Sequence, residues 1–267
     1  MMKKLSVFAV AFAAITFAAC GGNKTAQSTE GEDSVKSFEQ QQVEASIKMH
    51  VDSLASTIGQ LKHMPFMQEN DGSIALTAEE KQVKPDYLLP PTTENAATLA
   101  EKYRLLSALG IDKRLAKLYD MPVDEYEQAC SKLLAEINDP SFKDIQNAST
   151  VYETTTDLYN AMEANGRINY FWQLTASSLV EELYILSQNS EKFLASFNDE
   201  AAANSTFRIV LILDALDRLT EYDSEIQPVV EALRPLSALN ATTVDELRGQ
   251  LAEAKDQIDF ARNTLLK

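Results

Sequence analysis

Apolar residues recur along most of the chain at the three- and four-residue spacing that places side chains on one face of an α-helix. The first such stripe predicts a helix over about residues 37–63, which Pro65 ends. Its apolar positions are Ile47, Val51, Leu54, Ile58 and Leu61.

The clearest stripe lies near the C-terminus and predicts one continuous helix over about 243–266, which begins at the capping box Thr243-Val-Asp-Glu246. The apolar positions of this helix are Val244, Leu247, Leu251, Ala254, Ile258, Ala261 and Leu265. We expect the first and last stripes to be buried within one domain, where they can pack against each other. The alternative is that the C-terminal stripe stays exposed and binds a partner.

Breaks divide the chain between these two helices. Residues 65–92 hold four of the eight prolines and predict a long irregular connection, with a short helical turn at Thr77-Ala-Glu-Glu80. A helix that starts near Thr93 is expected to stop at Gly110, because glycine is a poor helix former. Asp112 can then cap a short helix through Tyr119.

Two further helical regions follow. Pro122 is expected as the first residue of a helix that runs to about Ile137. The second region spans 149–188, and Asn165-Gly166 interrupts it as a turn or a helix C-cap.

Residues 207–219 are apolar over most of their circumference, which is typical of a helix at the centre of a domain. A β-strand over the run from Ile209 to Leu213 is the competing interpretation. The spacing of Leu213, Leu216 and Leu219 favours the helix.

Composition narrows the fold class. The 267 residues include only 8 Gly and 8 Pro, too few for the tight turns of a doubly wound nucleotide-binding fold or a hairpin-rich β fold. The apolar fraction of 45% is too high for wholesale disorder. The sequence therefore predicts an all-α fold without a sheet: one domain over 37–267 of about eight helices, arranged as a bundle or an irregular array.

The N-terminus has the organisation of a secretory leader. Lys3 and Lys4 precede an apolar run that is too short to span a bilayer comfortably. The end of this run, Phe17-Ala-Ala-Cys20, resembles the lipobox of bacterial lipoproteins, with Phe in place of the commoner Leu. The resemblance implies a signal peptide over 1–19, and it implies that Cys20 becomes the lipid-modified first residue that anchors the protein in a membrane.

Residues 20–36 form the expected tether, a polar segment with one large apolar residue, Val35. The leader and tether resemble those of Bacteroidota lipoproteins. Gly21 after the cysteine favours the outer membrane, and the late acidic cluster from Glu30 favours a periplasm-facing protein over a surface-exposed one. Asp33-Ser34-Val35 and Asp52-Ser53-Leu54 resemble O-glycosylation sites of that group, which makes Ser34 and Ser53 candidate acceptors.

The mature domain resembles, at scattered positions, uncharacterised helical lipoproteins of gut Bacteroidota. The matching segments are Leu106–Ile111, Leu115–Tyr119, Trp172 and Glu181–Tyr184. The resemblance supports the fold and the localisation, and it carries no catalytic residues over to this chain.

The formal net charge of −16 opposes binding to nucleic acid or to anionic lipid headgroups. It indicates a solvated acidic surface or, as the alternative, a surface suited to a cationic partner. We interpret Glu181-Glu182 as a solvated helix face. Asp214 and Asp217, with Arg208 and Arg218, are expected to form a buried ion-pair network rather than a catalytic carboxylate pair.

Motifs for catalysis or for a metal are missing from the sequence. His50 and His63 are the only histidines and lie too far apart for a local metal site, and no zinc motif, phosphate-binding loop or nucleophile elbow occurs. Cys130 lies on an apolar helical face, where a buried inert thiol is expected. We therefore expect no enzyme activity, no metal and no cofactor.

The sequence predicts a lipid-anchored protein of the cell envelope that binds another envelope protein or an assembly without catalysis. The alternative is a helical solute-binding lipoprotein with a pocket between helices near Trp172, Tyr170 and Arg167, where an aromatic ring and a guanidinium could hold a ligand.

Overall fold

The structure, a computed structural model, describes residues 45–46, 48–53, 74–144 and 151–266. The described residues are 75% helical and contain no strand, which confirms the predicted all-α fold. Eight of their helices have seven or more residues, as many as expected, although several of the predicted boundaries are wrong.

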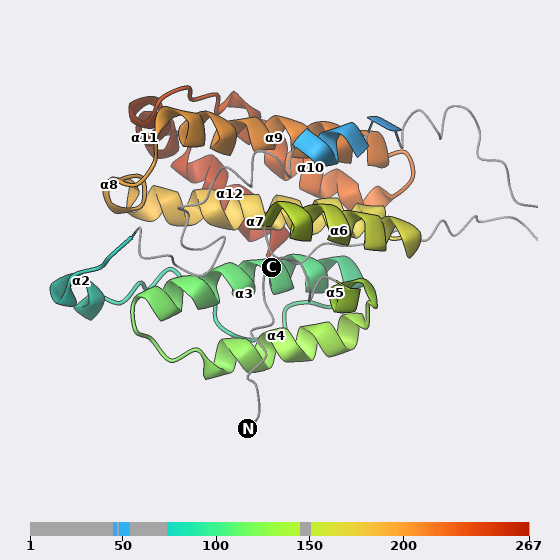
Figure 1. Ribbon diagram of the computed structural model, residues 1–267, viewed down its shortest axis with the longest axis horizontal. Coiled ribbons are helices and arrows are strands. Elements are labelled where there is room, and N and C mark those ends of the chain that lie inside the picture. Colours follow the sequence, from blue (N-terminus) through green and yellow to red (C-terminus); the bar gives the residue numbers. More distant parts are fainter. Residues whose placement is uncertain (1–44, 47, 54–73, 145–150, 267) are drawn as a thin grey trace, which may run out of the picture.

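Helix α7 (Ile168–Gln188) lies at the centre of the domain and buries 15 of its 21 residues. It packs against α3 (Leu99–Leu118), α9 (Asp199–Leu219) and α12 (Lys255–Leu265). Figure 1 shows the resulting layers, with α3 and α4 (Asp124–Ile137) on one side of α7 and with α9 and α10 (Gln227–Leu233) on the other. Because α7 has helices on most of its sides, nearly every position along it faces protein rather than water.

Helix α3 runs without a break through Gly110, so the predicted stop at Gly110 and the predicted cap at Asp112 are wrong. Glycine costs a helix interior about 1 kcal/mol relative to alanine. Full burial of Leu109, Ile111 and Leu115 contributes about 1.5–3 kcal/mol for each side chain and outweighs that cost.

The predicted end of the next helix is confirmed, whereas its predicted start at Pro122 is wrong. α4 starts at Asp124, after the N-cap Val123, and ends at Ile137, where Asn138 adopts a left-handed conformation with φ 48°. The short helix α5 (Ser141–Asp144) precedes α6 (Val151–Ala164). Gly166, with φ 63°, then separates α6 from α7, and the N–H of Arg167 bonds back to Met162 O at 2.9 Å.

Helix α9 confirms the helical interpretation of residues 207–219, and the competing strand interpretation is wrong. The expected central position is wrong as well. Phe207 and Val210 are 48% and 50% exposed, so one face of α9 forms part of the molecular surface.

The last stripe is divided between two helices, α11 (Val244–Glu253) and α12, which meet at Ala254 (φ −91°, ψ 10°). The prediction of one continuous helix is therefore wrong. α11 packs against α7, α8 (Ser190–Phe193) and α9, whereas α12 packs against α7 and α10. The change of direction at Ala254 lets each half bury its apolar positions against its own set of neighbours.

The C-terminal stripe is buried inside the domain, as expected, and its exposure as a partner site is ruled out. Its buried positions are Leu247, Leu251, Ile258, Ala261 and Leu265. Of the first helix, residues 45–46 and 48–53 are described and helical, and their polar contacts run to α9 and α6. The packing of that helix beyond Ser53 lies outside the described residues.

Shorter elements complete the chain. Helix α2 (Ala78–Gln82) begins at the predicted capping box, in which Thr77 and Glu80 bond to each other's backbone N–H. The 3-10 helices η2 (Ser224–Ile226) and η3 (Arg234–Ala238) flank α10.

Candidate functional site

Two adjacent glutamates at the middle of α7 are completely buried. The side chains of Glu181 and Glu182 are both 0% exposed. The prediction of a solvated helix face is therefore wrong, because α7 is covered on the sides to which these two positions point. A buried carboxylate requires a partner, and each glutamate pairs with an arginine from a different helix.

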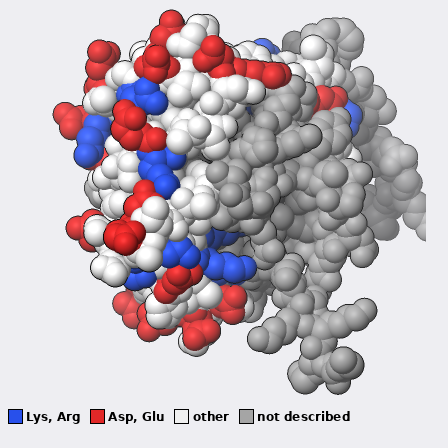
Figure 2. All heavy atoms as spheres, turned by 60° about the vertical axis from the view of Figure 1, so that its left-hand side comes forward, with Lys and Arg blue, Asp and Glu red and all other residues white. Residues whose placement is uncertain are grey.

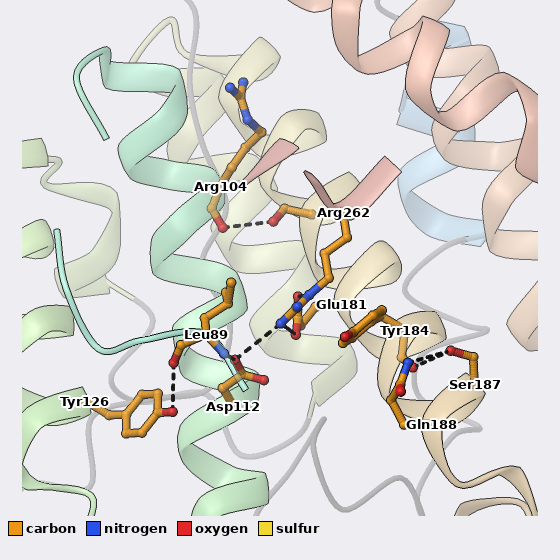
Figure 3. Close-up of polar contacts among 10 residues, drawn as sticks. Leu89, Arg104, Asp112, Tyr126, Glu181, Tyr184, Ser187, Gln188 and Arg262 are labelled. Carbon is orange, nitrogen blue, oxygen red and sulfur yellow. Dashed lines mark hydrogen bonds and ion pairs between the residues drawn. The ribbon is translucent and has the colours of Figure 1, made fainter. Parts of the chain in front are cut away.

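Glu181 binds Arg262 of α12 through two hydrogen bonds. Arg262 Nε and Nη2 donate to the two carboxylate oxygens at 2.7 and 2.6 Å, the bidentate geometry of a strong arginine–carboxylate pair. The other face of the guanidinium lies over the ring of Tyr184, with 3.8 Å between Cζ and the ring centroid. Figure 3 shows Arg262 next to Glu181 and Tyr184, and these contacts hold α12 against α7.

A second carboxyl group, Asp112 of α3, adjoins this pair. Its Oδ2 accepts a hydrogen bond from Leu89 N at 2.7 Å and lies 3.9 Å from Arg262 Nη2. Leu89 O in turn accepts a hydrogen bond from the hydroxyl of Tyr126 at 2.9 Å (Figure 3). The cluster thus joins α3, α4, α7 and α12 to the connection that precedes α3.

The pKa of Asp112 is raised well above its ordinary value of 3.8, first by burial and then by the negative charge of Glu181. Asp112 Oδ1 has no hydrogen-bond partner within the described part of the chain.

Glu182 forms the second buried pair, with Arg208 of α9. Arg208 Nη2 donates to Glu182 Oε2 at 2.6 Å, and the two side chains are 3% and 0% exposed. Burial raises the pKa of Glu182, and the charge of Arg208 opposes this shift. This pair has one hydrogen bond where Glu181 and Arg262 have two.

The predicted buried network of α9 is wrong, because only Arg208 among its four members points inward. Asp214 binds Arg218 at 2.8 Å, and both side chains are 40% exposed. Asp217 binds Arg234 at 2.8 Å and is also part of the surface. Asp214 additionally lies 2.9 Å from His50 Nε2, which connects the first helix to α9.

The three predicted pocket residues lie in two different environments. Trp172 is 0% exposed and packs edge-on against Phe171 in the core, with 5.0 Å between ring centroids. Tyr170 stacks on Tyr103 at 4.9 Å, and Arg167 Nη1 donates to the hydroxyl of Tyr103 at 3.1 Å.

The hydroxyl of Tyr103 donates to the buried Asp139 at 2.7 Å, and Arg167 lies 3.5 Å from the same carboxylate. Tyr170 and Arg167 are therefore brought together, around Tyr103. Trp172 lies inside the core instead.

Cys130 and Ser53, two further predicted positions, both lie in helices. Cys130 is buried, and burial raises the pKa of its thiol to about 11, which suits an inert side chain. The hydroxyl of Ser53 donates to Met49 O at 3.0 Å on a helix. Cys20, Ser34 and His63 lie outside the described residues.

The surface combines charge with one apolar face. Figure 2 shows the end of the domain that carries α2, α8 and α11, where acidic and basic side chains alternate. Ion pairs such as Lys81–Asp120, Lys192–Glu80 and Arg248–Glu191 account for this alternation. The outer side of α9 differs, because Phe207 and Val210 are exposed there one turn apart.

The described residues contain no group of three or more His, Cys, Asp or Glu side chains that could hold a metal ion. Within the same ranges, no helix is long and apolar enough to cross a membrane. Comparisons with protein-family models, with curated proteins and with solved structures gave no significant match.

The two buried ion pairs of α7 were not predicted, although the sequence contained a signal for one of them. Leu179, Ile185 and Leu186 stand three or four residues from Glu182 and place it within an apolar stripe. No comparable signal existed for the pairing of Glu181 with Arg262, because the two residues are 81 positions apart.

Proposed function

We propose that this chain is a lipid-anchored protein of the cell envelope that acts by binding another envelope protein and not by catalysis. The leader that ends in Phe17-Ala-Ala-Cys20 supports the anchor and the export. Gly21 and the late acidic cluster support attachment to the outer membrane with the domain facing the periplasm.

The observation that carries the binding function is the exposed apolar face of α9. Phe207 and Val210 are about half exposed within a helix whose other side is fully buried. Neighbouring exposed apolar side chains on one helix face can be covered by the apolar stripe of a partner helix.

The buried carboxylates support a role without catalysis. Asp112, Glu181 and Glu182 are buried carboxyl groups of neighbouring helices, and all three are closed to solvent. A substrate could reach them only if helices separated. The solute-binding alternative has less support, because Trp172 is part of the core and Arg167 already bonds to Tyr103.

The anchor is tested by the variant Cys20→Ser in the native host. We expect the protein to leave the membrane fraction or to keep its leader, as measured by fractionation and intact mass. Processed protein that stays in the membrane fraction after this change would contradict the anchor.

The binding function is tested by Phe207→Ser with Val210→Ser, compared with the control Phe260→Ser. Phe260 is 58% exposed and lies on α12, so the control removes an equally accessible ring elsewhere. Envelope proteins that co-purify with the wild type and with the control should be lost from the double variant. Identical sets from all three proteins would refute a role of the α9 face.

A further inference from the structure

The outer face of α9 has a defined pattern of charge and apolar surface. We define this face by Glu200, Ala203, Phe207, Val210 and Asp214, which follow one another at steps of three and four residues. Phe207 and Val210 form its apolar centre, while Glu200 and Asp214 place a carboxylate at each end.

The part of the chain that contains this face is strongly acidic. Residues 199–253 contain eleven acidic residues, four arginines and no lysine. Each arginine already pairs with a carboxylate of the described chain. The four pairs are Arg208–Glu182, Arg218–Asp214, Arg234–Asp217 and Arg248–Glu191. This part of the chain therefore carries more negative than positive charge, which favours a cationic partner over an anionic one.

We propose that the outer face of α9 binds a positively charged amphipathic helix of a partner protein. This inference rests on the proposed binding function and adds the chemistry of the partner. An apolar centre with the exposed carboxylate of Glu200 at its open end, within an acidic part of the chain, matches a helix whose apolar stripe is flanked by lysines or arginines.

Other classes of occupant fit less well. The negative charge repels nucleic acid and anionic lipid headgroups. An extended peptide adds to the edge of a sheet, and the described residues contain no strand. A second copy of this acidic chain would bring like charges together at both ends of the face.

One end of the face already has a neighbour. His50 Nε2 contacts Asp214, and Figure 1 shows residues 48–53 beside the C-terminal half of α9. The open part is therefore the turn that carries Val210 and Phe207, together with the end marked by Glu200. The experiment must separate a partner helix from coverage by residues 54–73 of this chain.

Photo-crosslinking in the native host tests the proposal on the full-length anchored protein. A benzophenone amino acid is placed at position 207 or 210, with position 260 as the control site. The attached peptide is identified by mass spectrometry. We expect a segment of another protein that has more Lys and Arg than Asp and Glu, and apolar residues at helical spacing.

Several results would overturn the proposal. Attachment to residues 54–73 of the same chain would show that the face is covered internally, and attachment to a second copy would show self-association. A neutral or acidic partner segment would refute the charge argument and leave the binding function standing. No adduct from either position would overturn both.

A charge variant gives an independent measure. Glu200→Lys with Glu221→Lys reverses two exposed carboxylates, one on this face and one just beyond the C-terminal end of α9, and it should lower the adduct yield about tenfold, because attraction becomes repulsion. The control Glu163→Lys, an exposed position at the end of α6, should leave the yield unchanged. An undiminished yield in the double variant would overturn the cationic partner, provided that its melting temperature matches that of the wild type.

Discussion

The inner side of α7 and the outer side of α9 differ in where they place charge and apolar surface. On α7, Glu181 and Glu182 are buried and paired with arginines at 2.6 Å. On α9, Phe207 and Val210 remain half exposed. The difference indicates that substitutions inside should change the stability of the domain, whereas substitutions outside should change what it binds.

The two buried ion pairs should also differ in how much stability is lost when the arginine is replaced. Removal of one partner from a buried ion pair costs about 3–5 kcal/mol, because the other charge is left without compensation. We expect Arg208→Met to lie near the upper end, about 5 kcal/mol, because its guanidinium is 3% exposed. Arg262→Met should cost about 3 kcal/mol, because Arg262 is 13% exposed and water can reach the site more easily.

Denaturant unfolding of both variants measures this difference. Arg218→Met is the matched control, since its ion pair with Asp214 is exposed and such pairs contribute about 0–1 kcal/mol. Equal losses in all three variants would show that burial does not set the importance of these arginines.

Truncation of a buried side chain in the C-terminal stripe should lower the free energy of unfolding by less than the loss of Arg208 does. Leu251 is 0% exposed, and Leu251→Ala should lower the free energy of unfolding by about 2–5 kcal/mol. Val83→Ala is the control, because Val83 is 75% exposed and surface truncations change stability by about 0.5 kcal/mol or less. A wild-type melting temperature for Leu251→Ala would contradict the burial of this stripe.

The buried carboxyl groups should have a smaller effect, which is to make the free energy of unfolding depend on pH. The folded-state pKa values of Asp112 and Glu182 are raised above 3.8 and 4.5 by burial. Each group therefore contributes stability that is fully present below its unfolded pKa and is lost as the pH rises through its folded pKa. We expect the free energy of unfolding to fall as the pH increases above about 4.5, since the unfolded chain then ionises first.

The variant Asp112→Asn tests the source of this slope. It keeps the oxygen that accepts from Leu89 N and removes the titration. Its free energy of unfolding should depend less steeply on pH than that of the wild type. An unchanged slope would assign the effect to other groups.

The fold class could be predicted because apolar spacing reports helices locally. The capping box at Thr77, the end of α4 at Ile137 and the break at Gly166 each depend on residues within one or two turns. The predictions failed where distant packing decided the outcome. The helix continues through Gly110 because its flanking leucines are buried, and the last helix is divided at Ala254 because its halves have different neighbours.

The candidate site was harder to predict for the same reason. A pair of adjacent glutamates has the same local sequence pattern on a solvated face and in a core. Only the packing of α9 and α12 against α7 distinguishes these two environments. The alternative of a cationic partner came from net charge alone, whereas the position of the apolar face required the structure.

The core ion pairs stabilise the domain and the outer face of α9 serves binding, and the unfolding of Phe207→Ser with Val210→Ser separates these two roles. If this face is free in the isolated protein, each substitution should lower the free energy of unfolding by about 1 kcal/mol, because each side chain is already half exposed. A loss of about 4 kcal/mol or more from the double variant, the size expected for large buried side chains, would show that this protein covers the face itself and would contradict a free binding surface on α9.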